Sequence, residues 1–162
     1  MKKILFAILA ISSGLSFAVD NPVYLDANIG VNTTYGAGLA TGANIGYLFN
    51  PNLGLEGGIT YGASNGSNWN SGNSYYMYDA AVKGILPLGD TFALYGKLGI
   101  AYNYYASCNG CSNGFNNGSN TGLLYGVGAQ FNLSKSWSLH LEDYSVSGNN
   151  PNMLVAGGEF KF

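Results

Sequence analysis

The sequence predicts an all-β fold, an eight-stranded antiparallel up-and-down transmembrane β-barrel. Eight segments alternate between large apolar residues and small or polar ones with a period of two, which is typical of half-buried strands. Only 9% of the 162 residues are charged, against about 25% in an ordinary soluble domain. The connections between segments are alternately short and long, as in bacterial transmembrane barrels. Together these observations favour an outer surface that faces lipid.

The composition excludes two other classes of protein. Hydrophobic residues make up 47% of the chain, far more than a disordered protein contains. The sequence has no Arg and a formal net charge of −2, so nucleic acid is not an expected partner.

The first segment predicts export rather than structure. Lys2 and Lys3 precede an apolar run at residues 4–11, and a small-residue pattern ends at Ala18. This is the layout of a cleaved signal peptide, and the run is shorter than the about 20 residues that a spanning helix needs. We therefore expect residues 1–18 to be a signal peptide and residues 19–162 a barrel domain. A buried N-terminal helix is the alternative.

The predicted strands follow in order, separated by turn-forming residues. They lie at residues 22–34, 39–49, 53–63, 74–86, 91–105, 122–132, 137–146 and 153–162. Tight turns at residues 50–52, 87–90 and 134–136 connect them on one side. The longer segments 64–73 and 106–121, made largely of Asn, Gly and Ser, lie on the other side with the connections at 36–38 and 147–152. Short turns on one side and longer loops on the other are typical of outer-membrane barrels.

The two faces of each predicted strand differ in size as well as polarity. One face carries Leu, Ile, Val and aromatic residues. Taken in order, the other face carries Tyr24, Asp26, Asn28 and Gly30 in the first strand, Gly54, Glu56, Gly58 and Thr60 in the third, Tyr95, Lys97, Gly99, Ala101 and Asn103 in the fifth, and Gly126, Gly128, Gln130 and Asn132 in the sixth. A soluble sandwich turns its polar face outward, whereas a narrow barrel needs a small, polar interior. Aromatic residues also gather at strand ends, as interfacial girdles do: Tyr47, Phe49, Tyr76, Phe92, Tyr104 and Trp137.

Several motifs carry a family resemblance. Residues 42–56 contain a strand, an Asn-Pro turn and the next strand, and residues 81–84, 95–99 and 139–142 follow in matching order. The chain ends on Glu159-Phe160-Lys161-Phe162. This ordered set resembles the transmembrane domain of the OmpA-type eight-stranded outer-membrane proteins, and Phe160 and Phe162 resemble the terminal motif that the assembly machinery reads.

The resemblance implies a location and partners. We expect a protein of the outer membrane of a Gram-negative (diderm) bacterium, in contact with outer-membrane lipid and lipopolysaccharide. The assembly machinery and periplasmic chaperones are further expected partners, the barrel is expected to be a monomer, and no cofactor or metal is expected. The expected role is structural, with loops at the cell surface.

Nine titratable residues are predicted to face the lumen. They are Asp26, Glu56, Asp79, Lys83, Lys97, His140, Glu142, Glu159 and Lys161. Such groups must pair or hold water, because an isolated buried charge is very costly. The resemblance implies a cluster that exchanges salt-bridge partners and gates a narrow pore, with matches at Glu56, Lys83 and Glu142. Gln130 and His140 depart from it, since an acid and an arginine are usual there. Interior packing and a gated pore both stay open as roles.

Asp143 does not fit the alternation. Strict alternation aims this carboxylate at lipid, where charged residues are unfavourable. A β-bulge after Glu142 would instead turn Tyr144 and Val146 outward, and we expect such a bulge.

The longer loops suggest two further features. Cys108 and Cys111 are expected to form a disulfide in an oxidising compartment, since no second ligand pair supports a zinc site. Neither long loop contains a charge, and Trp69 and Phe115 are candidate contacts with host surface molecules. An adhesin and simple solvated loops are therefore both open.

A hydrolase needs a Ser–His pair with an acid. The single His140 has Ser138 and Glu142 two residues away on the same face, roughly 7 Å apart at about 3.3 Å per residue. Any strand produces that spacing, so we do not expect an enzyme.

Overall fold

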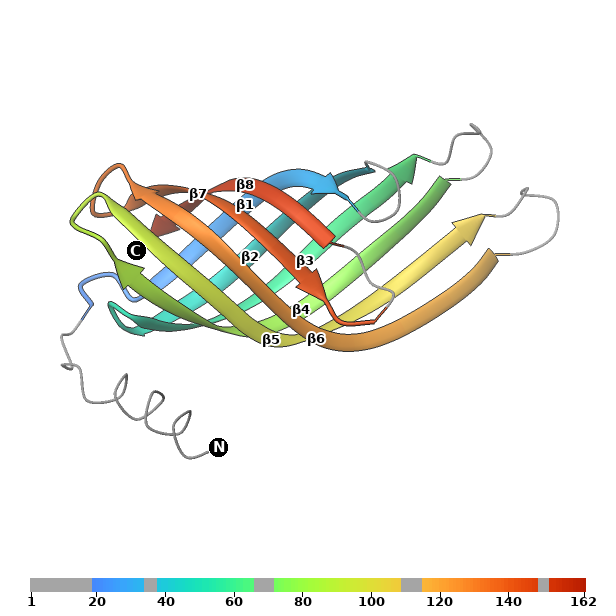
Figure 1. Ribbon diagram of the computed structural model, residues 1–162, viewed down its shortest axis with the longest axis horizontal. Helices are drawn as coiled ribbons and strands as arrows, with labels where there is room; N and C mark the ends of the chain where they lie inside the picture. The colour runs from blue at the N-terminus through green and yellow to red at the C-terminus, as the bar shows by residue number, and fades with distance from the viewer. Residues whose placement is uncertain (1–18, 34–37, 66–71, 109–114, 149–151) are drawn as a thin grey trace, which may run out of the picture.

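The computed structural model describes residues 19–33, 38–65, 72–108, 115–148 and 152–162. They form a closed barrel in which every strand pairs antiparallel with its sequence neighbours, and β1 pairs with β8 (Figure 1). The strands are β1 (Val23–Asn32), β2 (Gly38–Asn50), β3 (Leu53–Asn65), β4 (Gly72–Pro87), β5 (Phe92–Cys108), β6 (Phe115–Asn132), β7 (Trp137–Val146) and β8 (Asn152–Lys161). The predicted fold class is confirmed. No helix in these ranges is long and apolar enough to cross a bilayer.

The hairpin of β5 and β6 is longer than the alternation predicts. Its ladder continues without a break to the pair Cys108 and Phe115, so β6 begins seven residues before the predicted start at residue 122. Residues 115–121 lack apolar alternation because they lie beyond the hydrophobic wall. Backbone pairing alone extends the strand there, and composition carries no signal for it.

The outer wall is apolar and ends in aromatic residues. Leu98, Ile100 and Val127 are among its most exposed side chains. The tight turns and the C-terminus lie at the same end of the barrel (Figure 1). Trp137 begins β7 and Phe160 lies near the end of β8, and their ring centroids are 4.8 Å apart. Further toward the loops, the rings of Tyr61 and Tyr76 lie 5.2 Å apart. Two aromatic belts flanking an apolar band are what a bilayer selects on a transmembrane barrel.

The predicted bulge after Glu142 is wrong. β7 keeps a continuous register with both β6 and β8, so Asp143 is exposed on the outer wall while Tyr144 and Val146 are buried inside. The inward pair is favoured because Tyr144 and Val146 join a buried apolar cluster, and the Tyr144 and Thr60 hydroxyls lie 3.3 Å apart. A register shift does occur at Leu48 and Asn50, next to the Asn-Pro turn.

The interior has two layers of different chemistry. Toward the loops it is filled by a buried apolar cluster, which comprises Ala40, Tyr75, Met77, Ala81, Ala101, Leu124, Tyr144, Val146, Met153 and Val155. Toward the tight turns it is filled by buried charged side chains together with Gln130 and Ser138. The candidate site is this second layer.

Candidate functional site

An unbroken chain of ion pairs crosses the polar layer. Its members, called the ion-pair chain below, are Lys161, Glu159, Lys83, Glu56, Lys97 and Glu142 in spatial order. The successive nitrogen–oxygen distances are 3.4, 2.9, 3.8, 2.5 and 2.8 Å. Because the signs alternate, every one of its carboxylates touches at least one lysine. This arrangement meets the condition under which buried charges are tolerated.

Two buried tyrosines complete the carboxylate hydrogen bonds. The Tyr24 hydroxyl donates to Glu56, and the Tyr95 hydroxyl donates to Glu142, each at 2.8 Å. The Lys83 Nζ atom lies between the two rings, 4.8 Å from the Tyr24 centroid and 4.6 Å from that of Tyr95. A cation over an aromatic face adds attraction, so the rings help to fix Lys83.

Sequence reasoning placed both tyrosines on the inward face but missed their hydrogen bonds to the carboxylates, although a signal for these contacts exists. Tyr24 is the register partner of Gly46, and Tyr95 is the partner of Gly128. A Cβ at either glycine would overlap the facing ring. An inward tyrosine directly opposite a glycine therefore marks a ring that lies flat across the neighbouring strand, with its hydroxyl reaching further round the lumen.

Asp26 belongs to a separate group. Its Oδ2 atom lies 3.1 Å from Nδ1 of His140, and its Oδ1 atom accepts hydrogen bonds from the amide groups of Asn44 at 2.7 Å and Asn28 at 3.1 Å. His140 stands where the family resemblance implies an arginine. Its one nitrogen–carboxylate contact among the described residues is with Asp26, and it has none with the ion-pair chain.

Gln130, which departs from the family pattern, donates hydrogen bonds to side chains of β7 and β8. Its amide nitrogen donates to Ser138 at 3.0 Å and to Glu159 at 3.3 Å, and the Ser138 hydroxyl donates to Glu159 at 3.4 Å. Ser138 is thus bonded to Gln130 and Glu159 rather than His140. The structure does not assemble Ser138, His140 and Glu142 into a nucleophile, base and acid.

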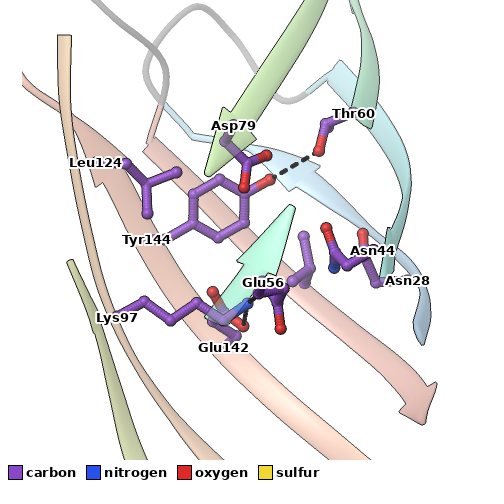
Figure 2. A pocket seen from close by; sticks show the side chains of 10 residues that line it. Asn28, Asn44, Glu56, Thr60, Asp79, Lys97, Leu124, Glu142 and Tyr144 are labelled. Atoms are coloured by element: carbon purple, nitrogen blue, oxygen red, sulfur yellow. Dashed lines mark hydrogen bonds and ion pairs between the residues drawn. The ribbon is translucent and has the colours of Figure 1, made fainter. Parts of the chain in front are cut away.

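Asp79 takes part in none of these pairs and lies beside a small cavity that Glu56, Lys97 and Glu142 also line (Figure 2). Among the described residues, Asp79 has no hydrogen-bond partner and no ion pair within 4 Å. Asn28, Asn44, Thr60 and Tyr144 are among the other residues that line the cavity. It offers about 10 Å³ for the centres of water-sized molecules, which is room for about one water. All nine predicted lumen residues thus face the interior, but they divide into the ion-pair chain, the Asp26 group and Asp79.

The remaining predicted residues lie at the barrel ends. Phe160 packs against Trp137, and its ring centroid lies 5.9 Å from that of Phe162, whose backbone nitrogen donates to Val23 at 3.0 Å. Cys108 ends β5 and Phe115 begins β6. Residues 1–18, Trp69 and Cys111 lie outside the described residues, so the signal peptide, the disulfide and the Trp69 contact stay predictions.

Comparison with known proteins agrees with this architecture. The model of the outer membrane protein beta-barrel domain family matches residues 4–152. No curated protein matches the chain.

Among solved structures, Ail, the attachment invasion locus protein of Yersinia pestis, is 15% identical with a TM-score of 0.62, covering 88% of this chain and 97% of its own. Ail has also been solved in complex with the heparin analogue sucrose octasulfate. Neisserial surface protein A is 14% identical with a TM-score of 0.69, covering 86% and 96%. The N-terminal barrel domain of Pseudomonas aeruginosa OprF is 16% identical with a TM-score of 0.64, covering 88% and 98%. At these identities the likeness concerns the fold.

Proposed function

Because the chain belongs to the outer membrane protein beta-barrel domain family, we propose that it is a non-conducting structural barrel of the outer membrane. Its signal peptide, residues 1–18, directs export and is cleaved. Its uncharged segments at residues 64–73 and 106–121, which include the ends of β3, β4, β5 and β6, face the cell surface. The observation that supports this role most directly is the filled interior, in which the ion-pair chain and the apolar cluster lie one above the other.

The energetics of the lumen support a closed barrel. Glu56, Lys83 and Glu142 have side chains no more than 5% exposed, and each has an ion-pair partner. Removing one partner from a buried pair costs about 3–5 kcal/mol. A water path through this layer would separate several pairs, and it would then meet the fully buried Met77 and Met153. Rigidity is therefore the favoured state.

Planar-bilayer recordings of the purified protein test the proposal. We expect no steady conductance from the natural protein. Glu56→Gln and Lys83→Met probe the ion-pair chain, and Asp90→Asn, in an exposed turn, is the matched control for loss of a charge. A steady, ohmic conductance that changes with Glu56→Gln and Lys83→Met but not with Asp90→Asn would refute the structural role.

One observation favours a narrow gated pore as the second candidate. Lys83 Nζ lies 2.9 Å from Glu159 and 3.8 Å from Glu56, and Lys97 contacts both Glu56 and Glu142. Lys83 and Lys97 are therefore each shared between two carboxylates, so a short movement of either lysine exchanges partners without leaving a charge unpaired. This candidate predicts brief openings whose frequency changes in Lys83→Met, and recordings without openings count against it.

An adhesin is the third candidate, and charge limits its ligand. Ail binds a sulfated heparin analogue, and sulfate groups are recognised by Lys and Arg. The two long loops of the present chain contain neither. Any host partner is therefore expected to be held by neutral groups, with Trp69 and Phe115 as apolar anchors. Replacing residues 106–121 by a neutral linker and measuring binding to host cells tests this candidate, and unchanged binding counts against the loop.

A further inference from the structure

Asp143 places a carboxylate on the apolar outer wall. Its two register partners, Val127 of β6 and Leu154 of β8, are exposed apolar residues. Among the described residues, Asp143 makes no hydrogen bond and no ion pair. The nearby Ser145 hydroxyl donates instead to Asn152, at 2.6 Å. Acyl chains offer no hydrogen-bond donor, so in the membrane this carboxylate stays unsatisfied unless another protein supplies one.

A donor without an acceptor lies on the next strand. Tyr125 of β6 is 50% exposed on the same wall, and its register partner Ser145 is two residues from Asp143. The Tyr125 hydroxyl makes no hydrogen bond among the described residues. A step of one strand (about 4.8 Å) and two residues (about 3.3 Å each) puts the Cα atoms of Tyr125 and Asp143 about 8 Å apart. The wall therefore carries an unpaired acceptor and an unpaired donor on adjacent strands.

These two residues lie at nearly the same depth in the membrane. Followed from partner to partner, the register starts at Val23, at the beginning of β1, and returns at Asn152, opposite the end of β1. Each strand on this path lies about 3 Å nearer the loops than the strand before it, at a tilt of about 40°. This offset lowers Tyr125 by about 3 Å, and its two residues along β6 raise it by about 5 Å. Tyr125 thus lies within about 2 Å of the depth of Asp143.

We propose that the wall of β6 and β7 binds a second copy of this chain, in place of the monomer that the family resemblance implies. Copies insert with the same orientation, so the two-fold axis of the pair runs along the membrane normal and every residue keeps its depth. An axis midway between Asp143 and Tyr125 brings each carboxylate to the hydroxyl of the partner's Tyr125. Both contacts form together, as an isologous interface requires.

The surroundings of the two contacts suit this pairing. Lipid is as apolar as the wall, so packing and hydrogen bonds, rather than the hydrophobic effect, drive association in a membrane. Val127 lies on the proposed axis, because it is one strand across from Asp143 and two residues from Tyr125 toward the tight turns. It is 67% exposed, so it is free to pack against its counterpart. The inference concerns the outer wall and does not rest on a closed lumen.

The first test measures the monomer–dimer equilibrium of the full chain by sedimentation equilibrium in density-matched detergent micelles. We expect a dimer for the natural protein. Tyr125→Phe removes both donors of the pair and should raise the dissociation constant about tenfold, and Asp143→Leu should abolish the dimer. Tyr102→Phe removes an exposed hydroxyl from β5 and, as the matched control, should dimerise like the natural protein.

The second test places a cysteine on the axis, with Cys108 and Cys111 replaced by Ser. Copper phenanthroline added to outer membranes should oxidise Val127→Cys to a disulfide between two copies. Ile45→Cys, at an exposed position of β2 four strands from β6, should stay uncrosslinked. The proposal is overturned if the natural protein sediments as a monomer at every concentration, or if Tyr125→Phe or Asp143→Leu dimerises like the natural protein. It is also overturned if Tyr102→Phe loses the dimer, or if Ile45→Cys crosslinks as much as Val127→Cys.

Discussion

Replacing Lys97 by Met tests whether the ion-pair chain stabilises the barrel. Lys97 contacts Glu56 at 2.5 Å and Glu142 at 2.8 Å, and its side chain is 8% exposed. Methionine has a similar length and no charge, so the substitution keeps most of the packing. What changes is the number of buried carboxylates that touch a cation.

The two carboxylates lose different amounts of stabilisation. Glu56 keeps Lys83, 3.8 Å away, and the Tyr24 hydroxyl. Glu142 keeps only the Tyr95 hydroxyl among the described residues. Breaking one buried ion pair costs about 3–5 kcal/mol, and most of that cost falls on Glu142. We therefore expect the free energy of unfolding to fall by about 3–5 kcal/mol in Lys97→Met.

Equilibrium unfolding by denaturant in detergent micelles measures this loss, and a second substitution identifies its origin. Adding Glu142→Gln to Lys97→Met removes the stranded charge and should recover about 2–3 kcal/mol, the upper end of coupling between contacting residues. Lys135→Met, in an exposed turn, is the matched control and should change stability by no more than about 0.5 kcal/mol. If Lys97→Met is as mild as Lys135→Met, or if Glu142→Gln recovers nothing, the ion-pair chain does not stabilise the barrel.

Three further predictions concern the wall, the lumen and the terminus. Asp143→Leu should raise the unfolding free energy by about 1–2 kcal/mol, because an aspartate on the lipid face costs less than the about 2–4 kcal/mol of a lysine; a loss of stability in the same denaturant assay contradicts the outward placement. Gly46→Ala should lower the unfolding free energy by about 1–3 kcal/mol, because the added methyl overlaps with the Tyr24 ring. Gly57→Ala, whose added methyl would have its nearest neighbour at 3.7 Å, should leave the unfolding free energy nearly unchanged. Equal effects of the two substitutions would refute the ring contact. Deleting Phe162 should reduce the amount of barrel recovered from outer membranes, and unchanged insertion in cells contradicts an assembly role.

The depth of Asp143 in the membrane explains why the sequence predicted a β-bulge that the structure does not contain. Asp143 lies six residues beyond Trp137 in β7, or about 15 Å along the membrane normal at about 3.3 Å per residue and a tilt of about 40°. That is near the middle of an apolar band about 25 Å tall, where a carboxylate is unexpected. Local chemistry therefore predicted a bulge. The backbone ladders with β6 and β8, together with burial of Tyr144 and Val146, outweigh the cost of a carboxylate that faces lipid.

Period-two alternation predicted most of the fold, but it did not predict which charged side chains pair inside the barrel. Inward placement of Glu56, Lys83 and Glu159 follows from parity within single strands. The contact between Lys83 and Glu159 joins residues 76 apart in sequence, and it depends on the register around the whole closed barrel. Local sequence contains no record of that register. Side-chain length and the rings of Tyr24 and Tyr95 then select which carboxylate each lysine meets.

The two departures from the family pattern account for the division of the lumen. An acid at position 130 would compete with Glu159 for Lys83, whereas the Gln130 amide donates to Glu159 and leaves Lys83 to bridge Glu159 and Glu56. An arginine at position 140 would add a long, permanent cation, whereas His140 reaches only Asp26 among the lumen carboxylates. Both substitutions separate the Asp26 group from the ion-pair chain. The same changes argue against a partner-exchanging gate, because they remove an acid and a permanent cation from the groups that could exchange partners.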